Sequence, residues 1–200
     1  MTVLFSSFHN YLDFSSGAAI TTREILIELA RRGRRVATLC GALFDRRDFS
    51  EIDFFRLLKR LNLPARVRRL ELATSSEVVP CREIAFNDTG IESTALFFGA
   101  DPTRGASPRA VPQSIGEGFF RFFLDALQRI KPRLYATYGG GWLAPRLADV
   151  AKRRGAQNLF WLHNASYDRS ELFRHFDVVA GKIPSRFWRF AAELIGCYRF

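Results

Sequence analysis

Two histidines follow apolar runs that are expected to be strands of a parallel sheet. His9 comes directly after the run 3–8, whereas His163 ends the run 158–163 and is followed by Asn164. An imidazole at the carboxyl end of a strand can donate a hydrogen bond to a substrate oxygen or stabilise a developing charge. A lone histidine is more often structural, so both a catalytic and a structural interpretation stay open for each.

A serine–glycine turn precedes the first expected helix. Ser15, Ser16 and Gly17 offer free backbone N–H groups at the positive end of a helix dipole, which is a common anion site. The alternative is that one serine caps the helix and Gly17 makes a tight turn.

A second glycine-rich turn follows the strand expected at 133–138. Tyr138 is followed by Gly139, Gly140 and Gly141, which either admit a ligand or relieve crowding between a helix and the sheet. Neither GxGxxG nor GxxxxGK[ST] occurs in the sequence, which argues against an NAD enzyme and an ATPase.

No group of residues in the sequence has the spacing of a known catalytic motif. GxSxG, HExxH and paired carboxylates on one helical face do not occur. Asp13, Asp168 and Asp177 stand near strand ends, where each could be a base but is more often a cap or a surface charge. The three cysteines show no CxxC spacing, which argues against a disulfide framework and a zinc cluster, and no metal is expected.

The elements that must position these residues alternate between strand and helix. Strands are expected at 3–8, 35–40, 133–138, 158–163 and 177–180, and helices at 17–32, 50–61, 114–129, 142–154, 170–175 and 185–195. An irregular β-rich and loop segment is expected over about 65–112, and its part 100–112 should be an exposed loop. This order predicts an α/β, Rossmann-like, doubly wound and mainly parallel sheet with helices on both faces.

Composition and charge restrict the class of protein. The 200 residues are 48% apolar and fit one domain, and no run of 18 apolar residues occurs. The net charge of +10 indicates an anionic partner or a bias toward arginine codons. The Phe-rich stretch 118–127 could anchor to a membrane, but a core helix is the better interpretation. The amino terminus lacks the pattern of a secretory signal, so a cytoplasmic setting is expected.

Several segments together resemble a known family. SSGAAITTREILIELARRGRRV, IKPRLYATYGGG, FWLHN and FDVVAGKIPSRFWRFAAELIG occur in the order found in family-4 retaining glycosyltransferases of the two-domain GT-B fold. The match is to their N-terminal, acceptor-side domain and covers most of the chain outside about 44–111.

The resemblance implies half of an enzyme that transfers a sugar from a nucleotide-sugar donor to a glycan or lipid-linked acceptor. The loop Ser15–Gly17 would face the donor diphosphate, and His163 would support the positive charge of the transferred sugar. The acceptor cleft would contain His9, Tyr138, Gly139, Gly140 and Asn164. No tightly bound cofactor and no metal are implied.

The resemblance also sets expectations for partners. A second, donor-binding domain or subunit would complete the cleft, so the chain alone is expected to be inactive. Many family members act at the cytoplasmic face of a membrane, so peripheral contact with the anionic inner membrane face is also expected. The main alternative is a non-enzymatic Rossmann-like module that binds an anionic ligand or a protein partner. Specific nucleic-acid binding ranks last, because no recognisable motif supports it.

Overall fold

The computed structural model describes residues 1–46, 49–99, 111–139, 142–162 and 174–181. The strands are β1 (Thr2–His9), β2 (Arg35–Leu43), β3 (Ala65–Ala73), β4 (Val78–Asp88), β5 (Ile91–Phe98), β6 (Leu134–Thr137), β7 (Gln157–Leu162) and β8 (Val178–Gly181). The helices are α1 (Gly17–Arg31), α2 (Glu51–Arg60), α3 (Gln113–Ile130) and α4 (Leu143–Arg153).

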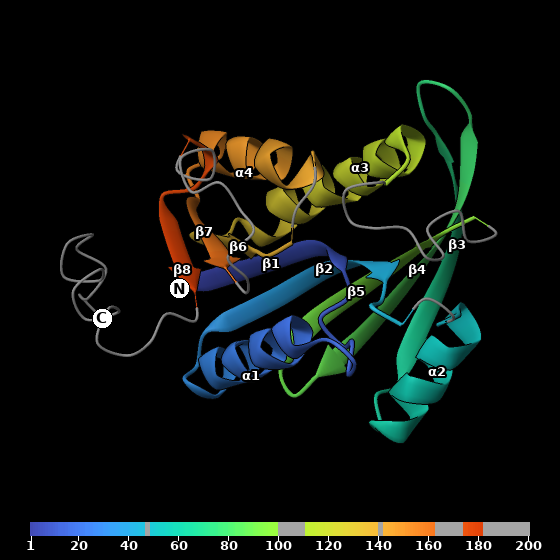
Figure 1. The fold of residues 1–200 in the computed structure, drawn as a ribbon, viewed down its shortest axis with the longest axis horizontal. Helices are drawn as coiled ribbons and strands as arrows, with labels where there is room; N and C mark the ends of the chain where they lie inside the picture. The colour runs from blue at the N-terminus through green and yellow to red at the C-terminus, as the bar shows by residue number, and fades with distance from the viewer. Residues whose placement is uncertain (47–48, 100–110, 140–141, 163–173, 182–200) are drawn as a thin grey trace.

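All eight strands form one sheet in the order β3-β4-β5-β2-β1-β6-β7-β8. From β5 to β8, each neighbouring pair is parallel. In chain order these six strands follow the 3-2-1-4-5-6 arrangement of doubly wound folds. Helices α1 and α2 cover one face of the sheet, and α3 and α4 cover the other (Figure 1). The fold class predicted from the sequence is therefore confirmed.

The segment 65–98 is more regular than the sequence indicated. It forms β3, β4 and β5, and β5 is a parallel neighbour of β2. Only the β3–β4 hairpin, whose strands pair antiparallel, extends the sheet beyond its doubly wound part. Most of the expected loop at 100–112 lies outside the described residues, but Val111 is buried rather than exposed. The helix expected at 185–195 and most of the one at 170–175 also lie outside them.

The Phe-rich stretch 118–127 belongs to the core. Phe119, Phe122 and Phe123 of α3 are buried against the sheet. Gly118 lets the helix approach closely, because a Cβ there would lie 3.1 Å from the ring of Phe98 and 3.2 Å from Leu72. These contacts support the core-helix interpretation. Among the described helices, none combines the length and apolar character that crossing a membrane requires.

The two helices on the α1 side begin with serines that differ in function. Ser50 closes a reciprocal capping box: its Oγ accepts from the N–H of Asp53, whose carboxylate accepts from the Ser50 N–H at 3.0 Å. Ser16 occupies the same position before α1, but its side chain makes no capping hydrogen bond.

We expect Ser50→Ala to lower the free energy of unfolding by about 1 kcal/mol, because the N–H of Asp53 in the first turn of α2 loses its acceptor. Denaturant titration measures the change. Ser16→Ala is the control at the matching position and should cost clearly less. Equal losses in both variants would show that the capping box does not stabilise α2.

Candidate functional site

The candidate site lies at the point where the strand order reverses. β2 lies on one side of β1, and β6, the first strand of the second half, lies on the other side. In open parallel sheets, ligands bind beyond the carboxyl ends of the strands at such a switch point. His9 ends β1 and Tyr138 follows β6, so the topology brings together two residues of the predicted acceptor cleft.

His9 is held on both sides of its ring. Its Nε2 lies 2.7 Å from Oδ2 of Asp13, and its Nδ1 lies 3.2 Å from the hydroxyl of Tyr138. Burial raises the pKa of Tyr138 well above its usual value, so the hydroxyl keeps its proton. In the tautomer that carries its proton on Nε2, His9 donates to Asp13 and accepts from Tyr138 at Nδ1.

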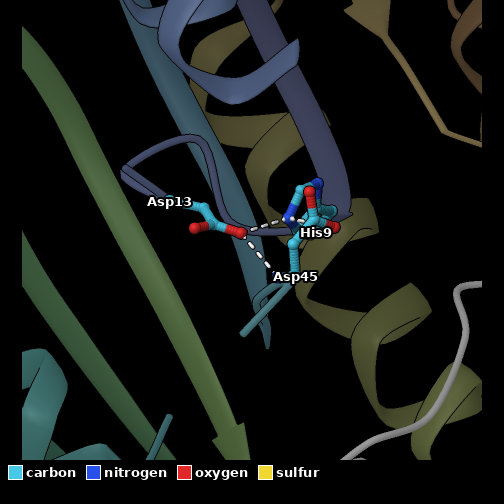
Figure 2. A group of neighbouring side chains, drawn as sticks. All are labelled: His9, Asp13 and Asp45. Atoms are coloured by element: carbon cyan, nitrogen blue, oxygen red, sulfur yellow. Dashed lines mark hydrogen bonds and ion pairs between the residues drawn. The ribbon is translucent and has the colours of Figure 1, made fainter. Parts of the chain in front are cut away.

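Asp13 is a buried carboxylate with four donors, and Figure 2 shows it beside His9 and Asp45. Its Oδ2 accepts from His9 and from the backbone N–H of Asp45 at 2.6 Å, while its Oδ1 accepts from the N–H and hydroxyl of Ser15. Burial opposes ionisation, but hydrogen bonds from His9, Ser15 and Asp45 outweigh it and lower the pKa of Asp13 to about 2. Asp13 is therefore ionised at neutral pH and is not a surface charge.

The loop after β1 is fixed to the end of β2 by Asn10. The Asn10 side chain donates to the carbonyl of Gly41 and accepts from the N–H of Leu12, both at 3.0 Å. Glycine is required at position 41, because a Cβ there would collide with the carbonyl oxygen of Phe8. This close approach of β2 brings Asp45 to Asp13.

A second polar cluster connects the loop after β1 to the residues around the β4–β5 turn. The Tyr11 hydroxyl lies 2.7 Å from the hydroxyl of Ser93 and 3.3 Å from Asp88. Asp88 has no exposed surface and receives two hydrogen bonds of 2.8 Å from Arg23 of α1. The loop that carries His9 and Asp13 is thus anchored at Asn10 and at Tyr11.

His9, Asp13 and Asp45 also present ligand atoms within 4.8 Å of one another, a spacing that a metal ion can use. However, the hydrogen bonds already account for this arrangement. Both Asp13 oxygens have two donors, and Asp45 contributes its backbone N–H while its side chain is 60% exposed. A metal ion bound here would replace the hydrogen bond between His9 and Asp13.

The remaining predicted site residues divide into two groups. Ser15 contacts Asp13, Ser16 is the buried N-cap of α1, and Gly17 is exposed with open space around it. Gly139 has a φ of 86° and lines a cavity of about 20 Å³, which has room for about one water molecule. The other three predicted site residues, Gly140, His163 and Asn164, lie outside the described residues.

Residue spacing alone does not reveal the central position of Asp13, and it does not select Asp45. The interval of four residues between His9 and Asp13 is visible in the sequence, but a loop with this spacing has no fixed geometry. Asp45 reaches the site only because β2 pairs with β1. No local pattern indicates that contact.

Comparisons with known proteins give only a distant structural likeness. No protein-family model matches the sequence, and no curated protein matches it. The structure is similar to that of the catalytic domain of starch synthase IV from Arabidopsis thaliana, bound to ADP and acarbose. The structural alignment covers 82% of this chain, with 16% sequence identity and a TM-score of 0.47. The chain spans about a third (34%) of that protein's chain. The resemblance to family 4 and to half of a GT-B enzyme stays a prediction.

Proposed function

We propose that this chain is the acceptor-side domain of a glycosyltransferase, which transfers a sugar from a nucleotide-sugar donor to a glycan or lipid-linked acceptor. The observation that supports it is the Asp13–His9–Tyr138 relay at the switch point of a 3-2-1-4-5-6 sheet. A second domain or a partner subunit would supply most of the donor site.

In this proposal the described residues position the acceptor, and none of them acts as a nucleophile. Asp13 fixes the His9 ring, and His9 holds the Tyr138 hydroxyl at the end of β6. That hydroxyl and Ser7, which donates to the Tyr138 carbonyl, face an acceptor hydroxyl at the mouth of the cleft. The Ser15–Gly17 loop faces the donor diphosphate. Gly140, His163 and Asn164 complete the cleft, and His163 supports the charge on the transferred sugar.

The acceptor role can be tested on the chain by saturation-transfer NMR with a panel of oligosaccharides and nucleotide sugars. We expect an oligosaccharide to bind, and Tyr138→Phe to weaken its binding about tenfold because one hydroxyl contact is lost. Tyr135→Phe is the matched control, since Tyr135 is also buried but packs in the core on the other face of the sheet. Binding unchanged in Tyr138→Phe, or equally weakened in both variants, would contradict the proposed cleft.

A second candidate function is binding without catalysis, with an anionic ligand or a protein as partner. The observation that favours it is that both ring nitrogens of His9 and both oxygens of Asp13 already have partners within the chain. Nucleotide-sugar turnover by the chain supplied with a donor-binding domain separates the two functions. Turnover that His163→Ala abolishes supports the transferase, whereas ligand binding without turnover supports the binding module.

A further inference from the structure

Basic side chains gather at the edge of the sheet opposite the candidate site. Helices α1, α3 and α4 end at this edge, and the parallel strands begin there. The starts of the central strands lie side by side, since Thr2 pairs with Arg35 and the N–H of Arg133 donates to the Thr2 carbonyl. We call this surface the amino edge and define it by residues 31–35, 129–133 and 152–154.

The amino edge carries a large excess of positive charge. Its basic residues are all exposed and are Arg31, Arg32, Arg34, Arg35, Arg129, Lys131, Arg133, Lys152, Arg153 and Arg154. Their acidic ion-pair partners are Glu28, Glu92 and Asp177. Ten positive charges against three negative ones leave +7 at this edge, out of +10 for the chain.

Helix-end stabilisation explains only part of this charge. Cations near a helix carboxyl end interact favourably with its dipole, and they are common there. Within the described residues, however, no carboxylate forms an ion pair with six of them: Arg31, Arg34, Lys131, Arg133, Arg153 and Arg154. Like charges at this density repel one another, and an anionic surface placed against them relieves the repulsion.

Apolar side chains are also accessible at this edge, between the basic residues. A cavity of about 280 Å³ lies between Lys131 and Arg154, with Leu127, Pro132 and Ala156 among its lining residues. Met1, at the start of β1, is 45% exposed. Cations around a small apolar floor suit a phosphate headgroup together with the glycerol beneath it.

Nucleic acid suits this surface less well. Proteins that bind single strands without sequence preference place aromatic rings against the bases. Among the described residues, the exposed aromatic side chains Phe14 and Trp142 lie instead in the loops that follow β1 and β6, at the opposite edge. We infer that the amino edge is a peripheral docking surface for anionic lipid headgroups.

The orientation of the bound protein follows from its charge distribution. At the opposite edge, Asp13 and Asp45 carry negative charge (Figure 2), so among the described residues the two ends of the strands differ in charge. With the amino edge on the membrane, the candidate site would lie one strand length away, about 25 Å for the eight residues of β1, and would face the aqueous side. This consequence rests in part on the proposed function, whereas the docking surface does not.

Co-sedimentation of the chain with phosphatidylcholine vesicles, with and without phosphatidylglycerol, tests the inference. We expect binding to the anionic vesicles alone, and we expect added salt to weaken it. Each cation close to the surface contributes about fivefold to the affinity, so Arg133→Glu/Arg154→Glu should weaken binding by about 25-fold or more. The control, Arg69→Glu/Arg121→Glu, changes the net charge equally on β3 and mid-α3 and should have a small effect.

Three results would overturn the docking surface. Equal losses in both double variants would mean that total charge, not this edge, attracts the membrane. Equal binding to neutral and anionic vesicles would exclude headgroup charge as the cause. Binding of a single-stranded oligonucleotide but not of anionic vesicles, lost in Arg133→Glu/Arg154→Glu, would assign the edge to nucleic acid. A Tm close to that of the original chain confirms that each variant is folded.

Discussion

Replacing Asp88 by alanine is expected to lower the free energy of unfolding by about 3–5 kcal/mol, because it leaves the Arg23 guanidinium without its buried partner. Asp88 has no exposed surface, and it accepts two hydrogen bonds from Arg23 and one from the hydroxyl of Tyr11. Denaturant titration measures the loss.

The Arg35–Glu92 pair gives a matched control for this prediction. Arg35 also donates two hydrogen bonds to a carboxylate on a neighbouring strand, but both side chains are about half exposed. Glu92→Ala should therefore cost less than about 1 kcal/mol. If Asp88→Ala fails to fold, Asp88→Asn keeps the shape of the side chain and allows the same comparison. A loss in Asp88→Asn no larger than in Glu92→Ala would show that burial does not strengthen the Arg23 pair.

The same cluster links stability to the candidate site. Tyr11 stands two residues from both His9 and Asp13, and its hydroxyl is bonded to Asp88 and Ser93. Loss of Asp88 should therefore also shift the NMR signals of the His9 ring, whereas Glu92→Ala should leave them in place. The anchor below the loop would then be shown to position the relay above it.

Much of the fold could be predicted because its signals are local. Capping serines, helical spacing and terminal glycines gave α1 and α2 to within about two residues, as Ser50 illustrates. The position of β5 could not be predicted in the same way. Its role in the parallel core depends on pairing between Val36 and Ile91, far apart in the sequence, and alternation alone does not separate a core strand from a hairpin strand.

For the candidate site too, local signals could be predicted and contacts between residues far apart in the sequence could not. His9 was selected because it follows an expected strand, whereas Tyr138, the last residue of the strand expected at 133–138, was placed in the acceptor cleft by the family resemblance. Their contact across 129 residues arises only from the order of β1 and β6. Asp13 was open to three interpretations, as a base, a cap or a surface charge. Its burial depends on the backbone of Asp45, 32 residues later, and no local pattern carries that information.

The second large effect concerns Asp13 and its dependence on pH. Its pKa falls from the ordinary value of 3.8 to about 2 in the folded protein. A group with a lowered folded pKa stabilises the protein above its unfolded pKa, and this contribution is lost as the pH falls through the folded pKa. At about 1.4 kcal/mol per pKa unit, the contribution is about 2 kcal/mol above pH 4 and should disappear between about pH 4 and pH 2.

Asp13→Asn should therefore lower the free energy of unfolding by at least about 2 kcal/mol at pH 7, and its difference from the original chain should shrink as the solution is acidified to about pH 2. The amide also brings N–H donors to a place where four donors already converge, so His9 should move its proton from Nε2 to Nδ1, which ¹⁵N NMR of the ring detects. Asp45→Asn is the comparison variant: it keeps the backbone N–H that bonds Asp13, and it removes the charge of a carboxylate that is 60% exposed and lies 3.5 Å from Nε2 of His9. A stability loss in Asp13→Asn that stays constant down to pH 2, with the ring proton still on Nε2, would mean that the charge of Asp13 does not organise the site. A loss that vanishes in acid, together with a moved proton, would establish Asp13 as the residue that sets the state of His9 and, through it, the direction of the Tyr138 hydroxyl.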